Sequence, residues 1–105
     1  MIYWTNTARA KDGQVRDAIE AATRLAEYTM ANFEEVKGVD LLETIHGTPA
    51  TLHWVIFCES LGDWETFREK WLANEEYMEL AGEVMEHVEY WDSNNSFYRV
   101  HVRLD

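Results

Sequence analysis

Asn6 and His53 are two polar side chains that the sequence places among apolar residues. Asn6 shares one face of an alternating segment with Ile2 and Trp4, so we expect its amide to be buried. A buried amide without a partner costs about 1 to 3 kcal/mol, so it either pairs with the backbone or holds a substrate oxyanion. His53 is either a general base near neutral pH or a hydrogen-bonded core or interface residue. The candidate chemistry is proton abstraction with stabilisation of an oxyanion.

A second group of candidates follows a helical spacing later in the chain. Trp71, Asn74 and Met78 lie on one stripe, and such aromatic stripes are more typical of a core than of a pocket wall. Asn74 is unexpected on this stripe because its side chain is polar. Because Glu75 and Glu76 follow it, we favour a helix cap over an amide that points into a cavity. The predicted ligand-binding residues are Trp54, Phe67, Asn74 and Met78.

Two sets of charged residues have the spacing of a binding site. The first set alternates along a predicted strand and comprises Arg99, His101 and Arg103. We interpret it as cross-strand pairing at a sheet edge, which also discourages aggregation. The second set has helical spacing and comprises Glu79, Glu83 and His87. We interpret it as a solvated acidic face, so no metal site is predicted.

The sequence contains no motif for nucleotide, zinc or acyl-transfer chemistry. It has no glycine-rich phosphate loop, no cysteine pair and no serine in a nucleophile elbow. We therefore predict no cofactor.

Length and charge limit the class of protein further. The 105 residues predict a single domain over residues 1–105. With 9 Lys+Arg against 20 Asp+Glu, the formal charge is −11, and the scattered basic residues argue against nucleic acid and anionic membranes as partners. Cys58 is the single cysteine, so no internal disulfide forms and a reducing, cytoplasmic location is expected. Neither a signal peptide nor a membrane-spanning segment is expected.

Hydrophobic periodicity predicts the elements that position these residues. Alternation predicts strands over residues 2–9, 39–45, 52–59 and 97–104. Helical spacing predicts a helix over 15–33, capped by Asp12, and a long helix over 64–88 that begins after a cap in 60–63 and is kinked if Asn74 interrupts it. Residues 92–95 predict a polar turn.

The resulting order is βαββαβ, the ferredoxin-like α+β arrangement of a four-stranded antiparallel sheet with two helices on one face. The strand over 52–59 is apolar on both faces, yet two helices cover only one. We therefore predict that the bare face packs against the sheet of a second copy, which makes a homodimer.

The whole chain resembles the dimeric α+β barrel superfamily, which includes antibiotic-biosynthesis monooxygenases, haem-degrading monooxygenases and NIPSNAP-like domains. The resemblance rests on size, element order, the doubly apolar segment 52–58 and the segment 63–72. In the monooxygenase branches an Asn and a Trp flank a cavity between sheet and helices, and Asn6 and Trp71 match them. The haem-degrading branch places a histidine ligand where this chain has Ala81, and His87 lies too far along, so no haem is expected.

Two functions follow from these observations. The first is a dimeric small-ligand-binding or accessory module, with a hydrophobic or aromatic ligand. The alternative is a cofactor-independent monooxygenase or isomerase acting on an aromatic or polyketide-like molecule, with Asn6, Trp71 and His53 as catalytic residues. Fold resemblance alone does not choose between them, and the first is favoured because no catalytic constellation is complete.

Overall fold

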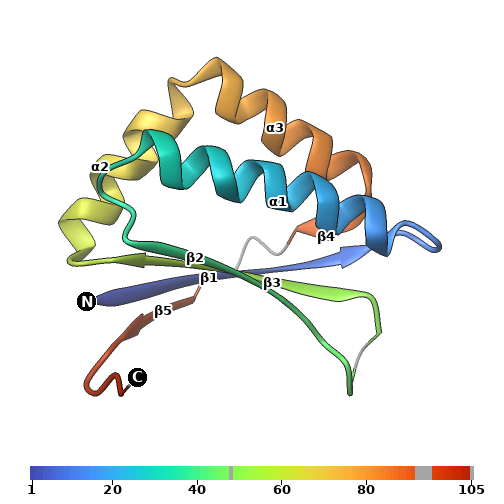
Figure 1. Cartoon of the computed structure of the whole chain (residues 1–105), viewed down its shortest axis with the longest axis horizontal. Helices are drawn as coiled ribbons and strands as arrows, with labels where there is room; N and C mark the ends of the chain where they lie inside the picture. The colour runs from blue at the N-terminus through green and yellow to red at the C-terminus, as the bar shows by residue number, and fades with distance from the viewer. Residues whose placement is uncertain (48, 92–95, 105) are drawn as a thin grey trace.

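A computed structural model of the chain describes residues 1–47, 49–91 and 96–104. Its helices and strands pack as one curled sheet with a helical layer above it (Figure 1). In chain order the elements are β1 (Ile2–Ala10), α1 (Val15–Asn32), β2 (Gly38–Glu43), β3 (Thr51–Cys58), α2 (Leu61–Leu72), α3 (Glu75–Glu86), β4 (Val88–Trp91) and β5 (Ser96–Arg99).

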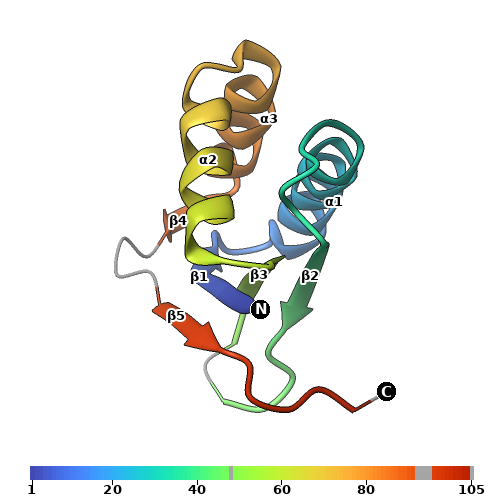
Figure 2. The same cartoon turned by 90° about the vertical axis from the view of Figure 1, so that its left-hand side faces the viewer.

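The sheet is antiparallel and its central strands are β3 and β1. The strand order is β2-β3-β1-β4, and β5 also pairs with β1. Figure 2 shows that all three helices cover one face of the sheet and that the C-terminal segment runs along the other. The predicted ferredoxin-like α+β fold is confirmed, with the helical layer made of three helices rather than two.

The chain breaks at Asn74 into α2 and α3, which confirms the helix cap favoured there and shows that one continuous helix over 64–88 does not form. Asn74 has an extended backbone, and its side chain caps α3 by accepting a hydrogen bond from the Tyr77 N–H. Val88, expected in the helix, instead begins β4. The first helix also starts differently, since Gln14 rather than Asp12 is its N-cap and makes no side-chain cap bond.

The predicted last strand is also wrong in extent. β4 pairs with the C-terminal half of β1, whereas β5 pairs with its N-terminal half and ends where Arg99 faces Ile2. Beyond that pair β1 offers no further partner residue, so residues 101–104 are exposed and form no strand. The turn expected at 92–95 lies outside the described residues.

Both faces of β3 are buried within the chain itself. Its even-numbered residues from Leu52 to Cys58 face the helices, while Val55 and Phe57 on the other face are only 9% and 6% exposed. The Phe57 ring packs edge-on against Tyr3, with centroids 4.3 Å apart, and lies 5.2 Å from the Arg103 guanidinium. The C-terminal segment therefore covers part of the sheet face that the helices leave bare.

No helix among the described residues is both long and apolar enough to cross a membrane.

Candidate functional site

Asn6 lies in the middle of β1 and points into the layer between the sheet and the helices. Alternation along β1 buries Trp4, Asn6 and Ala8, and the register places Asn6 beside Trp54 of β3. The Asn6 side chain is only 9% exposed, and its Oδ1 has no hydrogen-bond partner among the described protein atoms. Most buried polar atoms in proteins are paired, so this orphan acceptor is unusual.

The Asn6 side chain lines a small cavity whose other walls are apolar. The lining residues come from β1, α1, β2, β3 and α3, and they are Asn6, Ala8, Ala22, Leu41, Leu52, Trp54 and Val84. The cavity volume is about 10 Å³, close to the space that a single water molecule occupies. Asn6 is therefore the one polar side chain in this otherwise apolar lining.

Trp71 and Phe67 belong to an aromatic cluster that fills the space between β1 and α2. Trp71 stacks on Trp4 with ring centroids 5.5 Å apart, and Phe67 lies 4.8 Å from Trp71. Tyr77 of α3 also stacks on Trp71, with ring centroids 5.7 Å apart. Neither Trp71 nor Phe67 lines the Asn6 cavity, so their role in this structure is to pack the helices against the sheet.

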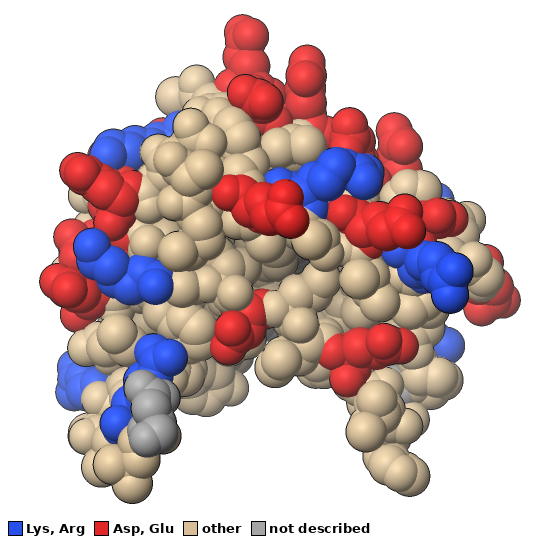
Figure 3. Space-filling model, viewed as in Figure 1, with Lys and Arg blue, Asp and Glu red and all other residues tan. Residues whose placement is uncertain are grey.

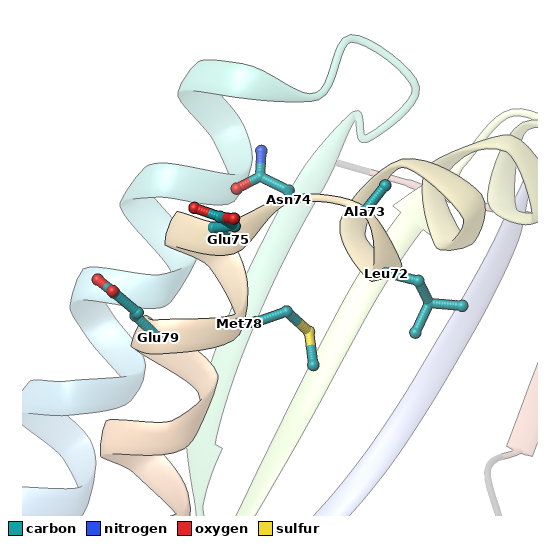
Figure 4. Close-up of a pocket in the computed structure, with 6 residues that line it drawn as sticks. All are labelled: Leu72, Ala73, Asn74, Glu75, Met78 and Glu79. Atoms are coloured by element: carbon teal, nitrogen blue, oxygen red, sulfur yellow. The ribbon is translucent and has the colours of Figure 1, made fainter.

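Asn74 and Met78 line a different hollow, which lies on the surface where α2 meets α3 (Figure 4). This hollow has a volume of about 430 Å³, and Met78 extends into it from α3 and is 48% exposed. Asn74 Oδ1 is fully engaged, because it accepts hydrogen bonds from the Tyr77 N–H at 2.8 Å and from the Tyr28 hydroxyl at 3.0 Å. Asn74 is thus a structural cap.

His53 lies on the opposite face of the sheet from Asn6. Its Nε2 is 2.8 Å from the Thr44 hydroxyl and its Nδ1 is 3.4 Å from the Thr7 hydroxyl. It lines a hollow of about 410 Å³ with neighbours from β1, β2, β3 and β5, which are Thr5, Thr7, Leu42, Val55, Ser96 and Tyr98. The structure therefore brings together Asn6 and Trp54, but not Asn6 and His53.

Two of the charged residues with helical spacing, Glu83 and His87, contact residues of other elements. Glu83 Oε2 accepts a hydrogen bond from Arg24 at 3.3 Å, and His87 Nδ1 is 3.0 Å from the Gln14 side-chain oxygen. Within the described ranges, no three His, Cys, Asp or Glu side chains are grouped closely enough to hold a metal ion. Ala81 offers no ligand atom, so the residues in this part of α3 do not fit a histidine-ligated haem.

The buried carboxylate of Glu35 was not predicted from sequence patterns. Glu35 is only 7% exposed and its Oε2 lies 2.8 Å from Lys70 Nζ. It follows Glu34 in the connection after α1, where a pair of acidic residues is typical of an exposed loop. Nothing local in the sequence distinguishes these two glutamates.

No protein-family model matches the sequence, and no curated protein matches it. Solved structures do match. A NIPSNAP domain protein from Burkholderia xenovorans has a TM-score of 0.79 with 13% identity and covers 100% of both chains. A NIPSNAP family protein of unknown function from Agrobacterium tumefaciens has a TM-score of 0.76 with 17% identity over 93% of this chain and 86% of that one.

A candidate antibiotic biosynthesis monooxygenase from Nitrosomonas europaea has a TM-score of 0.75 with 14% identity, covering 97% of this chain and 100% of that one. The structural similarity establishes the fold, but at identities this low it leaves the activity open. The chain therefore shares its fold with these NIPSNAP-family and antibiotic biosynthesis monooxygenase-like structures.

Proposed function

We propose that this protein is a homodimeric module that binds a small apolar or aromatic molecule carrying one hydrogen-bond donor. The ligand lies beside Asn6, between the sheet and helices α1 and α3. The observation that carries the proposal is the Asn6 Oδ1 acceptor, which is buried, has no partner among the described protein atoms and lines an apolar cavity. An apolar pocket with a precisely placed polar group is the usual form of a small-molecule site.

The cavity must enlarge to admit such a ligand. At about 10 Å³ it has room for about one water molecule, so side chains of the lining have to move apart on binding. Ala8 and Ala22 have small side chains, so they fill little of the space beside Asn6. Leu41, in the edge strand β2, is only half-buried. Movement of Leu41 would open the cavity toward solvent between β2 and α1. The ligand hydroxyl or N–H then donates to Asn6 Oδ1.

The sheet face opposite the helices is the proposed dimer interface. Leu42 and Tyr98 on this face are 52% and 54% exposed, and Val55 lies between them at the base of the hollow that His53 also lines. An exposed apolar surface of this kind on a curled sheet is characteristic of an interaction site. Light scattering coupled to size exclusion is expected to give twice the monomer mass, and a stable monomer would contradict the dimer.

Ligand binding without turnover is favoured over a monooxygenase or isomerase. The candidate base His53 lies on the far side of the sheet from Asn6, and Trp71 is packed in the aromatic cluster. The three residues needed for that chemistry do not converge on one space.

A pair of probe molecules tests the binding site. We expect 4-ethylphenol, which has a hydroxyl donor, to bind about fivefold more tightly than ethylbenzene, because one neutral hydrogen bond contributes about 1 kcal/mol. Asn6→Leu should abolish this preference while ethylbenzene still binds. Affinities come from NMR titration of the ¹⁵N-labelled protein.

The control variant is Asn74→Ala, which alters the surface hollow of Figure 4 and leaves Asn6 intact. It should keep the full preference for 4-ethylphenol. Equal binding of the two probes to the wild-type protein, or loss of the preference in Asn74→Ala alone, would overturn the assignment to Asn6.

A further inference from the structure

Another hollow lies at the end of the molecule where β3 leads into α2, away from the Asn6 cavity. It has a volume of about 350 Å³, and seven residues line it: Glu34, Glu35, Lys37, Glu59, Asp63, Thr66 and Lys70. They come from the connection after α1, the residue after β3 and one side of α2, from Asp63 in its first turn to Lys70 in its last. In Figure 3 acidic and basic side chains alternate over this end of the molecule, at the left of the view.

Glu35 distinguishes this hollow from an ordinary charged surface. Its side chain is more than nine-tenths buried, and Oε2 accepts a hydrogen bond from Lys70 Nζ at 2.8 Å. Oε1 is also buried and has no hydrogen-bond partner in the part of the chain that the structure describes. A buried carboxylate oxygen without a donor is strongly unfavourable, because burial removes the water that would otherwise bind it. Oε1 therefore needs an N–H or O–H donor.

The net charge of the lining determines whether a cationic, neutral or anionic donor is favoured. Four carboxylates face two lysines, which leaves a net charge of −2 on the hollow. Lys37 Nζ donates to the Glu34 backbone oxygen at 3.1 Å, so part of its hydrogen-bonding capacity is used within the loop. The same negative field reaches Cys58, whose thiol pKa is raised to about 11 by burial and then by the charges of Asp63 and Glu35. A cation is favoured here and an anion is disfavoured.

We propose that this hollow binds a small organic cation with a primary ammonium group, one N–H of which donates to Glu35 Oε1 once the side chains that bury this oxygen shift apart. Among the described residues, no three His, Cys, Asp or Glu side chains are grouped closely enough to hold a metal ion. This favours an organic cation over a divalent metal. A volume of about 350 Å³ is within the range of small-molecule sites and suits a short diamine. The second ammonium group of the diamine then lies near the exposed carboxylates of Glu34 and Glu59.

Calorimetric titration with 1,4-diaminobutane at neutral pH and low ionic strength tests this site. Glu35→Gln should weaken binding about tenfold or more, because it replaces a charge-assisted hydrogen bond with a neutral one. The matched control is Glu79→Gln, which removes one exposed carboxylate from α3 and is expected to change the affinity less than about twofold. Circular dichroism establishes that each variant is folded.

Glu59→Gln decides the question if Glu35→Gln fails to fold, because Glu59 is exposed and its loss cannot disturb the core. It should weaken diamine binding severalfold. The proposal is overturned if the wild-type protein gives no binding heat with 1,4-diaminobutane, if Glu79→Gln weakens binding as much as the hollow variants, or if Mg²⁺ binds there and the diamine does not.

Discussion

Replacing Asn6 with leucine should make the protein more stable, although the substitution falls in the middle of the central sheet. Leucine has the same branching and the same number of side-chain heavy atoms as asparagine, and it removes a buried oxygen that has no partner among the described atoms. A buried unpaired polar atom costs about 1 to 3 kcal/mol, so Asn6→Leu should raise the free energy of unfolding by about that amount. For a domain of this size the melting temperature should rise by roughly 5 to 15 °C.

The matched control is the other asparagine of the predicted site. Asn74 Oδ1 accepts two hydrogen bonds and caps α3, so Asn74→Ala should lower the free energy of unfolding by about 1 kcal/mol. Two asparagines of one protein are thus expected to respond with opposite signs. A stabilising substitution at a buried polar position is typical of a residue kept for binding rather than for folding.

Urea denaturation followed by tryptophan fluorescence measures both variants. All samples need the same protein concentration, because the apparent stability of a protein that forms the proposed dimer depends on concentration. The reasoning is refuted if Asn6→Leu destabilises the protein as much as Asn74→Ala does, since Asn6 would then be a hydrogen-bonded structural residue.

Three further predictions follow from individual contacts. Cys58 is buried and the pKa of its thiol is raised from 9.0 to about 11, so it should react with iodoacetamide at least about 100-fold more slowly in the native protein than in urea; comparable rates would contradict this burial. Gly38→Ala should lower the free energy of unfolding by about 1 to 3 kcal/mol, because a Cβ there would lie 2.6 Å from a Phe57 ring carbon; Phe57→Leu in the same chain should restore part of the loss, and an unchanged urea midpoint would show that the ring moves aside. Burial raises the pKa of the Tyr77 hydroxyl above its usual 10.0, so the folded state retains a proton that the unfolded state loses, and stability should fall as the pH rises above about 10. Tyr77→Phe should lose less stability than the wild-type protein over the same pH range, as measured by urea midpoints.

The fold could be predicted from the sequence wherever one or both faces of an element are buried. The alternation of Trp4, Asn6 and Ala8 specified β1 and the inward direction of Asn6, and the apolar run of β3 specified a central strand. Asn74 followed by two glutamates carried a recognisable cap signal, although helical periodicity continued through it. These are local patterns with a direct physical cause.

Long-range pairing could not be predicted in the same way. The short extent of the last strand, β5, and the presence of the additional strand β4 depend on which residues of β1 they pair with, and that is a property of the partner strand. Glu35 resembles Glu34 in sequence, and only the approach of Lys70 from α2 distinguishes it. Asp12 has the chemistry of a helix cap, but Gly13 with a φ of 73° separates it from the first turn of α1. Each outcome depends on tertiary contacts.

The side-chain amide signal of Asn6 tests the central claim most directly. It can be assigned in a ¹H–¹⁵N spectrum as the amide pair that disappears in Asn6→Leu. Addition of 4-ethylphenol should shift this pair and the indole N–H signal of Trp54, which lines the same cavity. Shifts confined to the surface hollow beside Met78, or an Asn6 signal that does not move at saturating ligand, would contradict a binding site between the sheet and the helices.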